Sequence, residues 1–129
     1  MTTKKTTSIT PFLTVPDGRE AVKFYVSAFD AVEVKRFDMP DDKISSVIEI
    51  GNARFFVGDE EVHNGNVSPV PGAAHSVRIV LETSDADRLY SQAISAGAVS
   101  VCPMTTEDDW RIGKLKDPSG HLWELGYTL

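Results

Sequence analysis

Residues 117–125 read DPSGHLWEL and join a Pro-Ser-Gly turn to a short apolar strand near the end of the chain. Leu122, Trp123 and Leu125 are typical of a buried strand, yet Glu124 stands among them. An ionised carboxylate is costly to bury unless a cation, a metal ion or hydrogen-bond donors meet it. We therefore expect Glu124 to have a specific partner, and the identity of that partner bears on what the chain does.

This strand belongs to the second copy of a pattern that also occurs earlier in the chain. A shift of about 68 residues aligns GNARFFVG (51–58) with SGHLWELG (119–126), and a shift of about 67 aligns FDAVEV (29–34) with AGAVSV (96–101). Each copy predicts the order β-α-β-β-β, so the fold class is α+β. We expect one domain over residues 1–129, with module one at about 9–58, a Gly-, Pro- and Asn-rich linker at 59–74, and module two at about 75–127.

Module one begins with ITPFLTV (9–15), whose apolar residues alternate as in a strand. Asp17 is expected to cap the helix that follows, and Glu20 to complete a capping box. Gly51 and Asn52 are expected to supply the positive φ angles of a tight hairpin turn. The remaining strands of this module are predicted at 31–37, 43–50 and 53–58.

Module two repeats this order from AHSVRIVLE (74–82), which predicts a strand. The stretch TSDADRLYSQAISAG (83–97) predicts a capped helix that Gly97 stops. TTEDDW (105–110) is interpreted as a charged loop that could cover a pocket. The remaining strands are predicted at 98–101, 111–117 and 120–127.

Composition excludes several classes of function. The chain has 129 residues and a net charge of −6, which argues against a nucleic-acid partner because phosphate binding needs a basic surface. No apolar run is long enough to span a membrane, and the N-terminal MTTKKTTSIT (1–10) lacks the apolar core of a signal peptide. Cys102 is the single cysteine, so no internal disulfide forms, which suits the reducing cytoplasm.

Three motifs together resemble the vicinal-oxygen-chelate superfamily, which comprises glyoxalase I, extradiol dioxygenases, fosfomycin-resistance enzymes and bleomycin-binding proteins. They are KFYVSAF (23–29), IEIGNARFFVGDE (48–60) and DPSGHLWEL (117–125). Within the superfamily the chain looks most like the PhnB-like branch. The resemblance implies two βαβββ modules whose curled mixed sheets surround a cavity. It also implies that modules face each other, within one chain or across a homodimer.

Metal-dependent members of that superfamily commonly hold the metal with two histidines and two glutamates from the first and last strands of each module. Carried over, these positions fall on Thr10, Phe56, Arg78 and Glu124. Only Glu124 matches the family pattern, and a divalent site needs several N, O or S donors. The branch's frequent histidine at the third strand is Ser45 here, and its WGxR motif appears as DDWR (108–111), which retains the arginine at Arg111 but displaces Trp110.

Two classes of function follow from this resemblance. The first is a protein that binds a small organic molecule without a cofactor, sequestering a drug or metabolite as the bleomycin-binding relatives do, which would make antibiotic resistance a role. The second is a lyase, isomerase or dioxygenase that uses a divalent metal such as Zn, Ni, Mn or Fe, held by His75 or Asp59 with Glu124. A metal-free enzyme with Glu124 as its catalytic base lies between them.

The candidate ligand-binding residues are those expected to face the cavity. We expect the guanidinium of Arg78 to pair with Glu124 where a metal ion would sit, because a planar fork matches a carboxylate. His121, whose side chain points away from the Glu124 face, is interpreted as structural. The full candidate ligand-binding set is Phe12, Thr14, Phe56, Arg78, Trp110 and Arg111.

Overall fold

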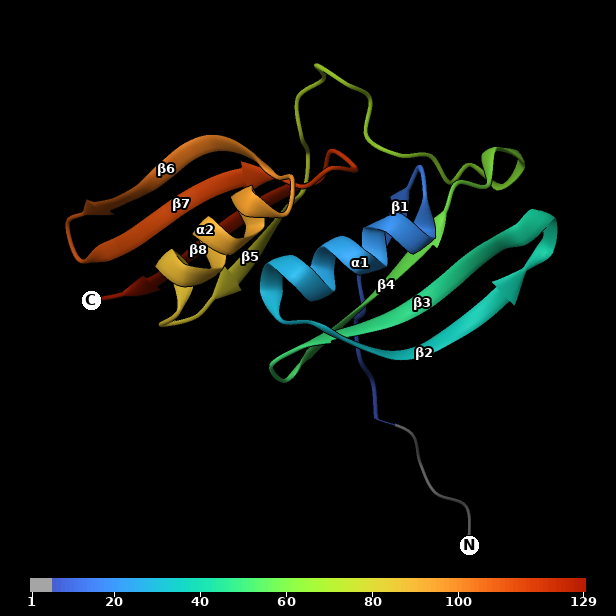
Figure 1. The fold of residues 1–129 in the computed structure, drawn as a ribbon, viewed down its shortest axis with the longest axis horizontal. Helices are drawn as coiled ribbons and strands as arrows, with labels where there is room; N and C mark the ends of the chain where they lie inside the picture. Colours follow the sequence, from blue (N-terminus) through green and yellow to red (C-terminus); the bar gives the residue numbers. More distant parts are fainter. Residues whose placement is uncertain (1–5) are drawn as a thin grey trace, which may run out of the picture.

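The computed structural model describes residues 6–129 (Figure 1). Residues 1–5, part of the N-terminal stretch considered above, lie outside the described residues. None of the described helices is both long enough and apolar enough to cross a membrane. Module one contains β1 (Phe12–Val15), α1 (Gly18–Phe29), β2 (Val32–Met39), a 3-10 turn η1 (Pro40–Asp42), β3 (Lys43–Ile50) and β4 (Ala53–Asp59). After a second 3-10 turn η2 (Val62–Asn64), module two contains β5 (Arg78–Glu82), α2 (Ala86–Ser95), β6 (Val99–Glu107), β7 (Trp110–Lys116) and β8 (Leu122–Thr128).

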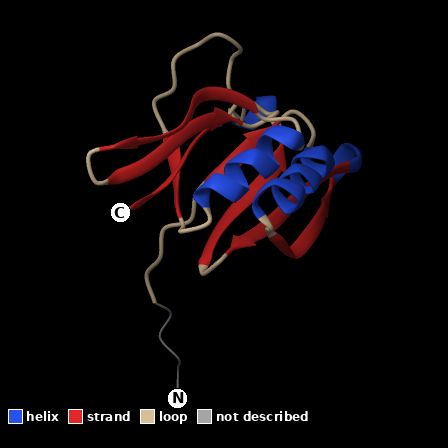
Figure 2. Ribbon diagram, turned by 60° about the vertical axis from the view of Figure 1, so that its left-hand side comes forward, coloured by secondary structure: helices blue, strands red, loops and turns tan. Residues whose placement is uncertain are grey.

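The two modules have the same topology, which confirms the predicted α+β class with two βαβββ modules. The strand order is β1-β4-β3-β2 in one sheet and β5-β8-β7-β6 in the other. In both sheets the first strand runs parallel to the last, and the other neighbours are antiparallel. Each helix packs on its own sheet, and α1 and α2 lie side by side (Figures 1 and 2).

The first helix begins as the sequence predicts, with one difference. The Asp17 side chain accepts a hydrogen bond from the Glu20 backbone N–H at 3.2 Å, as an N-cap does. The Glu20 carboxylate, however, pairs with Lys23 Nζ at 3.2 Å, so it forms a surface ion pair in place of the second half of a capping box. The helix ends at Asp30, which adopts a left-handed conformation with φ 55°.

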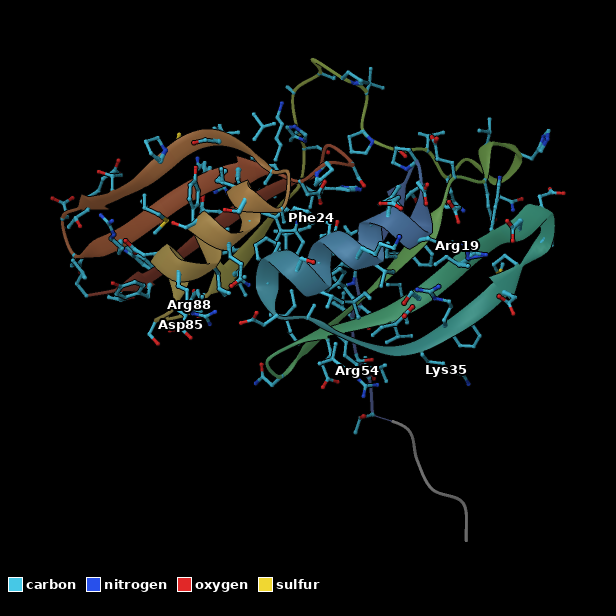
Figure 3. The ribbon with its side chains drawn as sticks, in the orientation of Figure 1. Arg19, Phe24, Lys35, Arg54, Asp85 and Arg88 are labelled. Atoms are coloured by element: carbon cyan, nitrogen blue, oxygen red, sulfur yellow. The ribbon has the colours of Figure 1, made fainter. Side chains whose placement is uncertain are left out.

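The start of the second helix lacks a side-chain cap, although the sequence predicts a capped helix. Asp85, the N-cap residue, makes no capping bond with its side chain, which pairs instead with Arg88 at 3.3 Å (Figure 3). Thr83 Oγ1 holds the entry to the helix by accepting from the Asp85 backbone N–H at 3.1 Å. Gly97 follows the helix with φ 117°, which confirms it as the residue that stops α2.

Two predicted turns also differ from the structure. Most of TTEDDW (105–110) is strand, because β6 continues to pair with β7 as far as Glu107 and Trp110. Asp108, with φ 55°, and the residue after it form the hairpin turn, so the predicted loop is reduced to a tip. In the module-one hairpin only Gly51 has a positive φ, at 56°; Asn52 does not.

Both modules contribute to one aromatic core. Trp123 of β8 packs against Tyr25 and Phe29 of α1, with ring centroids 5.6 and 4.7 Å away, and against Phe55 of β4 at 5.7 Å. Trp123, Tyr25 and Phe29 are almost completely buried. Large aromatic side chains contribute most of the burial energy in a core of this kind. Module two therefore depends on the helix of module one for the environment of its last strand.

A buried carboxylate joins the same two segments. Asp117 accepts hydrogen bonds from the backbone N–H groups of Ser119 and His121, at 3.0 and 2.9 Å, through Oδ1. Its Oδ2 accepts from Trp123 Nε1 at 2.9 Å and from the hydroxyl of Tyr25. Burial, together with the neighbouring Asp117 carboxylate, raises the pKa of the Tyr25 hydroxyl well above its ordinary value, so that hydroxyl remains a donor. Four donors thus stabilise the charge inside the core.

Replacing this carboxylate should destabilise the fold. Asp117→Asn substitutes an NH2 donor for one oxygen, so two of the four buried donors lose their acceptor, whichever way the amide is turned. We expect the free energy of unfolding, measured by urea denaturation, to fall by about 3 kcal/mol. Asp109→Asn, at the exposed tip of the β6–β7 hairpin, is the control and should stay within about 0.5 kcal/mol. Equal losses in the two variants would contradict the role of Asp117.

Candidate functional site

The second sheet has one face against α2 and one face free of any helix. Buried side chains of Leu115, Trp123 and Leu125 lie on the helix side. Strand alternation turns the residues between them to the opposite side. We call this opposite side the open face; it carries Arg78, Val80 and Glu82 of β5, Leu122, Glu124 and Gly126 of β8, Trp110, Ile112, Lys114 and Lys116 of β7, and Glu107 of β6.

Glu124 lies at the centre of this face between two cations. Its register partners are Val80 on β5 and Lys114 on β7. Its Oε1 lies 3.5 Å from Arg78 Nε and 3.7 Å from Lys114 Nζ. Arg78 is therefore beside Glu124 on the neighbouring strand, as expected from the sequence, whereas the contribution of Lys114 was not predicted.

The contact between Arg78 and Glu124 is looser than a bidentate ion pair. The Glu124 side chain is only 15% exposed, but that of Arg78 is 61% exposed. Solvent screens such a pair, which limits its contribution to stability to less than about 1 kcal/mol. Its significance lies in electrostatics, because the single carboxylate at the centre of the face is neutralised by the protein's own cations.

A pocket of about 400 Å³ opens on the same face next to Glu124. Its apolar and aromatic lining consists of Val80, Ile112 and Trp110, whose indole is half-exposed. The other lining residues are Glu82, Glu107, Asp108, Glu124 and Gly126. The pocket therefore combines the apolar and aromatic surface that is usual in a small-molecule site with four carboxylates.

Arg111 lies on the other side of the sheet. Its guanidinium pairs with Asp87 at the start of α2, at 2.6 Å, and bonds to Thr106 Oγ1 at 3.3 Å. Hydrogen bonds from Arg111 lower the pKa of the Asp87 carboxyl. Trp110 and Arg111 are neighbours in sequence, so strand alternation separates them, and only Trp110 borders the pocket.

The candidate residues of module one lie on the corresponding face of the first sheet. Phe12 and Phe56 pack there with ring centroids 5.8 Å apart, and the Phe12 ring lies over Gly58. A separate hollow of about 360 Å³ is lined by Phe12, Ser45, Gly58 and their neighbours. The backbone oxygen of Thr14 bonds to His121 Nε2 at 2.8 Å, a contact that ties the β7–β8 turn to β1. Within one chain, Trp110 and Glu124 therefore line one hollow and Phe12 lines another, while Thr14, Phe56, Arg78 and Arg111 line neither.

The donor set does not fit a divalent metal ion. Of the four family positions only Glu124 carries a ligating group, and Arg78, itself one of the four, and Lys114 already occupy its carboxylate. Asp59 accepts from the backbone N–H groups of Gly18 and Ile44, both at 2.8 Å, and thereby holds α1 to β3. Within residues 6–129 no three His, Cys, Asp or Glu side chains gather as such a site requires.

Strand parity could have revealed the missed residues. Ile112 and Lys114 lie two and four positions after Trp110 on β7, so strand alternation places all three side chains on the same face. The register of β7 on β8 then places Lys114 opposite Glu124. Register is the missing information, because two strands joined by a turn of unknown geometry can pair in more than one way. The acidic end of the pocket depends in the same way on where the β6–β7 hairpin turns.

Comparisons with known proteins agree with this fold. The sequence model of the Glyoxalase/Bleomycin resistance protein/Dioxygenase superfamily matches residues 7–125. An uncharacterized protein of Mycobacterium bovis is 36% identical over 126 residues, which cover 92% of this chain and 82% of that protein. TioX from Micromonospora sp. ML1 shares the fold with a TM-score of 0.73 at 23% identity, covering 96% of this chain and 100% of that one. The fosfomycin resistance protein FosX from Mesorhizobium loti shares it with a TM-score of 0.70 at 17% identity, covering 95% and 91%.

Two glycines at equivalent positions of the modules should respond differently to substitution. A Cβ at Gly126 would clash with the backbone oxygen of Arg111, which cannot move without separating β7 from β8. A Cβ at Gly58 would meet the Phe12 ring at 2.8 Å, and that exposed side chain has room to turn away. We expect Gly126→Ala to cost about 3 kcal/mol in urea denaturation, and Gly58→Ala about 1 kcal/mol or less. If Gly58→Ala lost more unfolding free energy than Gly126→Ala, the close spacing of β7 and β8 would not be what excludes a side chain at Gly126.

Proposed function

The chain belongs to the glyoxalase/bleomycin resistance protein/dioxygenase superfamily, and we propose that it binds a small organic molecule on its open face without a resident metal ion. The observation that carries the proposal is the pocket beside Glu124, where the indole of Trp110 lines the pocket together with the apolar side chains of Val80 and Ile112. A flat aromatic ligand would gain burial and stacking energy against these side chains. The biological role would be sequestration of a drug or metabolite.

The charges beside Glu124 support metal-free binding. A divalent ion bound to the Glu124 carboxylate would be repelled by two cations close to it. Arg78 Nε and Lys114 Nζ lie 3.5 and 3.7 Å from Glu124 Oε1. A second copy of the chain adds the same four family positions and thus no new donors. The metal-dependent lyase, isomerase or dioxygenase reaction considered above would need ligands that this arrangement does not offer.

The acidic lining also bears on the kind of molecule bound. FosX is a fosfomycin resistance protein. In this chain Glu82, Glu107 and Asp108 line the pocket and would repel an anionic group of any ligand. If the protein confers resistance, the compound it binds is expected to present an apolar or cationic group to this end of the pocket.

Membership of the PhnB-like branch is part of the proposal. Its support is that KFYVSAF and DPSGHLWEL, the motifs on which the resemblance rests, meet through Tyr25 and Asp117. The aromatic core shared by both modules supports one domain. A cytoplasmic location is supported by Cys102, which is exposed and forms no disulfide.

We further propose a homodimer. Each sheet is covered by a helix on one face only, and the uncovered faces expose large apolar side chains, including Phe12, Phe37, Val80 and Trp110. Exposed apolar side chains gathered on one face mark an interaction surface more often than a solvated one. A second copy would cover these faces and close the pockets, and two-fold pairing is the commonest symmetry of soluble oligomers.

Ligand binding should be visible in tryptophan fluorescence. Trp123 is buried, so quenching by a compound in the pocket should arise from Trp110, and Trp110→Phe should abolish it. The screen should include bleomycin-type drugs, catechols and the glutathione hemithioacetal of methylglyoxal. Saturable quenching by one of them, lost in Trp110→Phe, is the expected result. Nickel- or zinc-stimulated turnover of the hemithioacetal would overturn the proposal in favour of an enzyme.

The mass in solution tests the homodimer. Light scattering at micromolar concentration should give twice the mass of the 14.1 kDa chain. Placing a charge on an uncovered face, as in Phe37→Asp, should shift the mass toward the monomer, because an unpaired charge is costly to bury at an interface. A matched exposed apolar residue outside these faces, changed in Val70→Asp, should leave the mass unaltered. A wild-type monomer under these conditions would contradict the proposal.

A further inference from the structure

Charges on the open face are sorted along the strands. Pairing of β5, β8 and β7 sets Arg78 and Lys116 on either side of Leu122 at one end. Glu82 lies four residues beyond Arg78 along β5, next to Gly126, and Ile112 lies on the other side of Gly126. Trp110 and Glu107 pair with each other at the far end of β7. The open face therefore has a cationic end, formed by Arg78, Lys116 and Lys114 beside Glu124, and an acidic end, formed by Glu82 and Glu107.

The cationic end carries more positive than negative charge. Arg78 and Lys114 have one salt-bridge partner each within residues 6–129, and it is the same carboxylate, that of Glu124. Two positive charges against one negative charge leave a net charge of about +1 even before Lys116 is counted. Both side chains have more N–H donors than the ones that face Glu124, whose own side chain is only 15% exposed. This end therefore offers an anion a charge-assisted hydrogen bond.

The acidic end carries negative charge that no cationic side chain among the described residues balances. Across residues 6–129, the carboxylates of Glu82, Glu107 and Asp108 make no salt bridge and accept no side-chain hydrogen bond, yet all three line the pocket. Trp110 lies among them, and an indole face attracts a cation through its ring quadrupole. A flat cationic group would be stacked and neutralised here at the same time.

The spacing of the two ends sets the length of a matching ligand. Four residues of strand separate Arg78 from Glu82, which is about 13 Å at the usual rise per residue. Arg78 reaches back toward Glu124, so the two groups of a ligand would be separated by roughly 10 Å. Resting on the binding function proposed above, we propose that the ligand is an elongated zwitterion. Its flat cationic group lies against Trp110 between the carboxylates, and its anionic group lies on Arg78 and Lys114.

Three synthetic probes of equal length test this assignment by isothermal titration calorimetry. The zwitterion is a quinolinium whose ring nitrogen carries an alkyl chain ending in a carboxylate. The cation-only probe has the same ring and chain with a terminal methyl group, and the anion-only probe replaces the ring with neutral naphthalene. We expect the zwitterion to bind at least about tenfold more tightly than either of the others, since each charged contact adds of the order of a tenfold change.

Variants separate the two ends. The double variant Arg78→Gln/Lys114→Gln should weaken the zwitterion about tenfold or more, whereas the cation-only probe should bind as tightly or more tightly, because Glu124 is then unpaired. Glu107→Gln should weaken both cationic probes and spare the anion-only probe. Arg54→Gln is the matched control; this exposed arginine pairs with Glu49 at the module-one hairpin (Figure 3). It should change no affinity.

The outcomes distinguish this inference from the function on which it rests. Equal affinity of the zwitterion and the cation-only probe, unchanged in the double variant, would overturn the zwitterion assignment and leave small-molecule binding on the open face intact. Failure of all three probes to bind, together with failure of the fluorescence screen, would overturn the proposed function itself. A response of the zwitterion to Arg54→Gln equal to that of the double variant would show that overall charge, and not the open face, determines binding.

Discussion

The buried carboxylate of Asp117 is the contact on which the arrangement of the two modules depends. It holds the turn between β7 and β8 through two backbone N–H groups, and it also accepts from Tyr25 of α1 and Trp123 of β8. A charge at this depth is stable only because all four donors are present. This carboxylate therefore joins the helix of module one to the last strand of module two, alongside the packing of Trp123 against Tyr25 and Phe29.

This constraint also determines what the open face presents. With its indole N–H bonded to Asp117, Trp123 points into the core, and strand alternation then turns Glu124 to the opposite side. The pairing of β8 with β7 and β5 brings Lys114 and Arg78 to that carboxylate. Asp117 thus stabilises the core, and Glu124 pairs with the cations of the surface that we propose binds the ligand. Both carboxylates lie within residues 117–125.

The sequence predicts the repeated modules well, because aligned copies, strand alternation and the Asp17 cap are local signals. It does not predict the role of Asp117, since a turn aspartate is ordinarily exposed and its partner Tyr25 lies 92 residues away. The position of Lys114 beside Glu124 was not predicted, because it depends on the register of β7 on β8. The ion pair of Arg111 with Asp87 was not predicted either, because it depends on which side of the sheet faces α2. Both positions depend on contacts between segments that are distant in sequence, and the composition of the chain does not indicate such contacts.

We propose that the protein's own cations, Arg78 and Lys114, occupy the place of a metal ion beside Glu124. The most direct test is elemental analysis by mass spectrometry after the purified protein has been equilibrated with manganese, nickel and zinc and then dialysed. With the two cations in that place, the chain and its Glu124→Gln variant should retain the same trace amounts of metal. Retention of about one metal ion per chain, lost in Glu124→Gln, would contradict it.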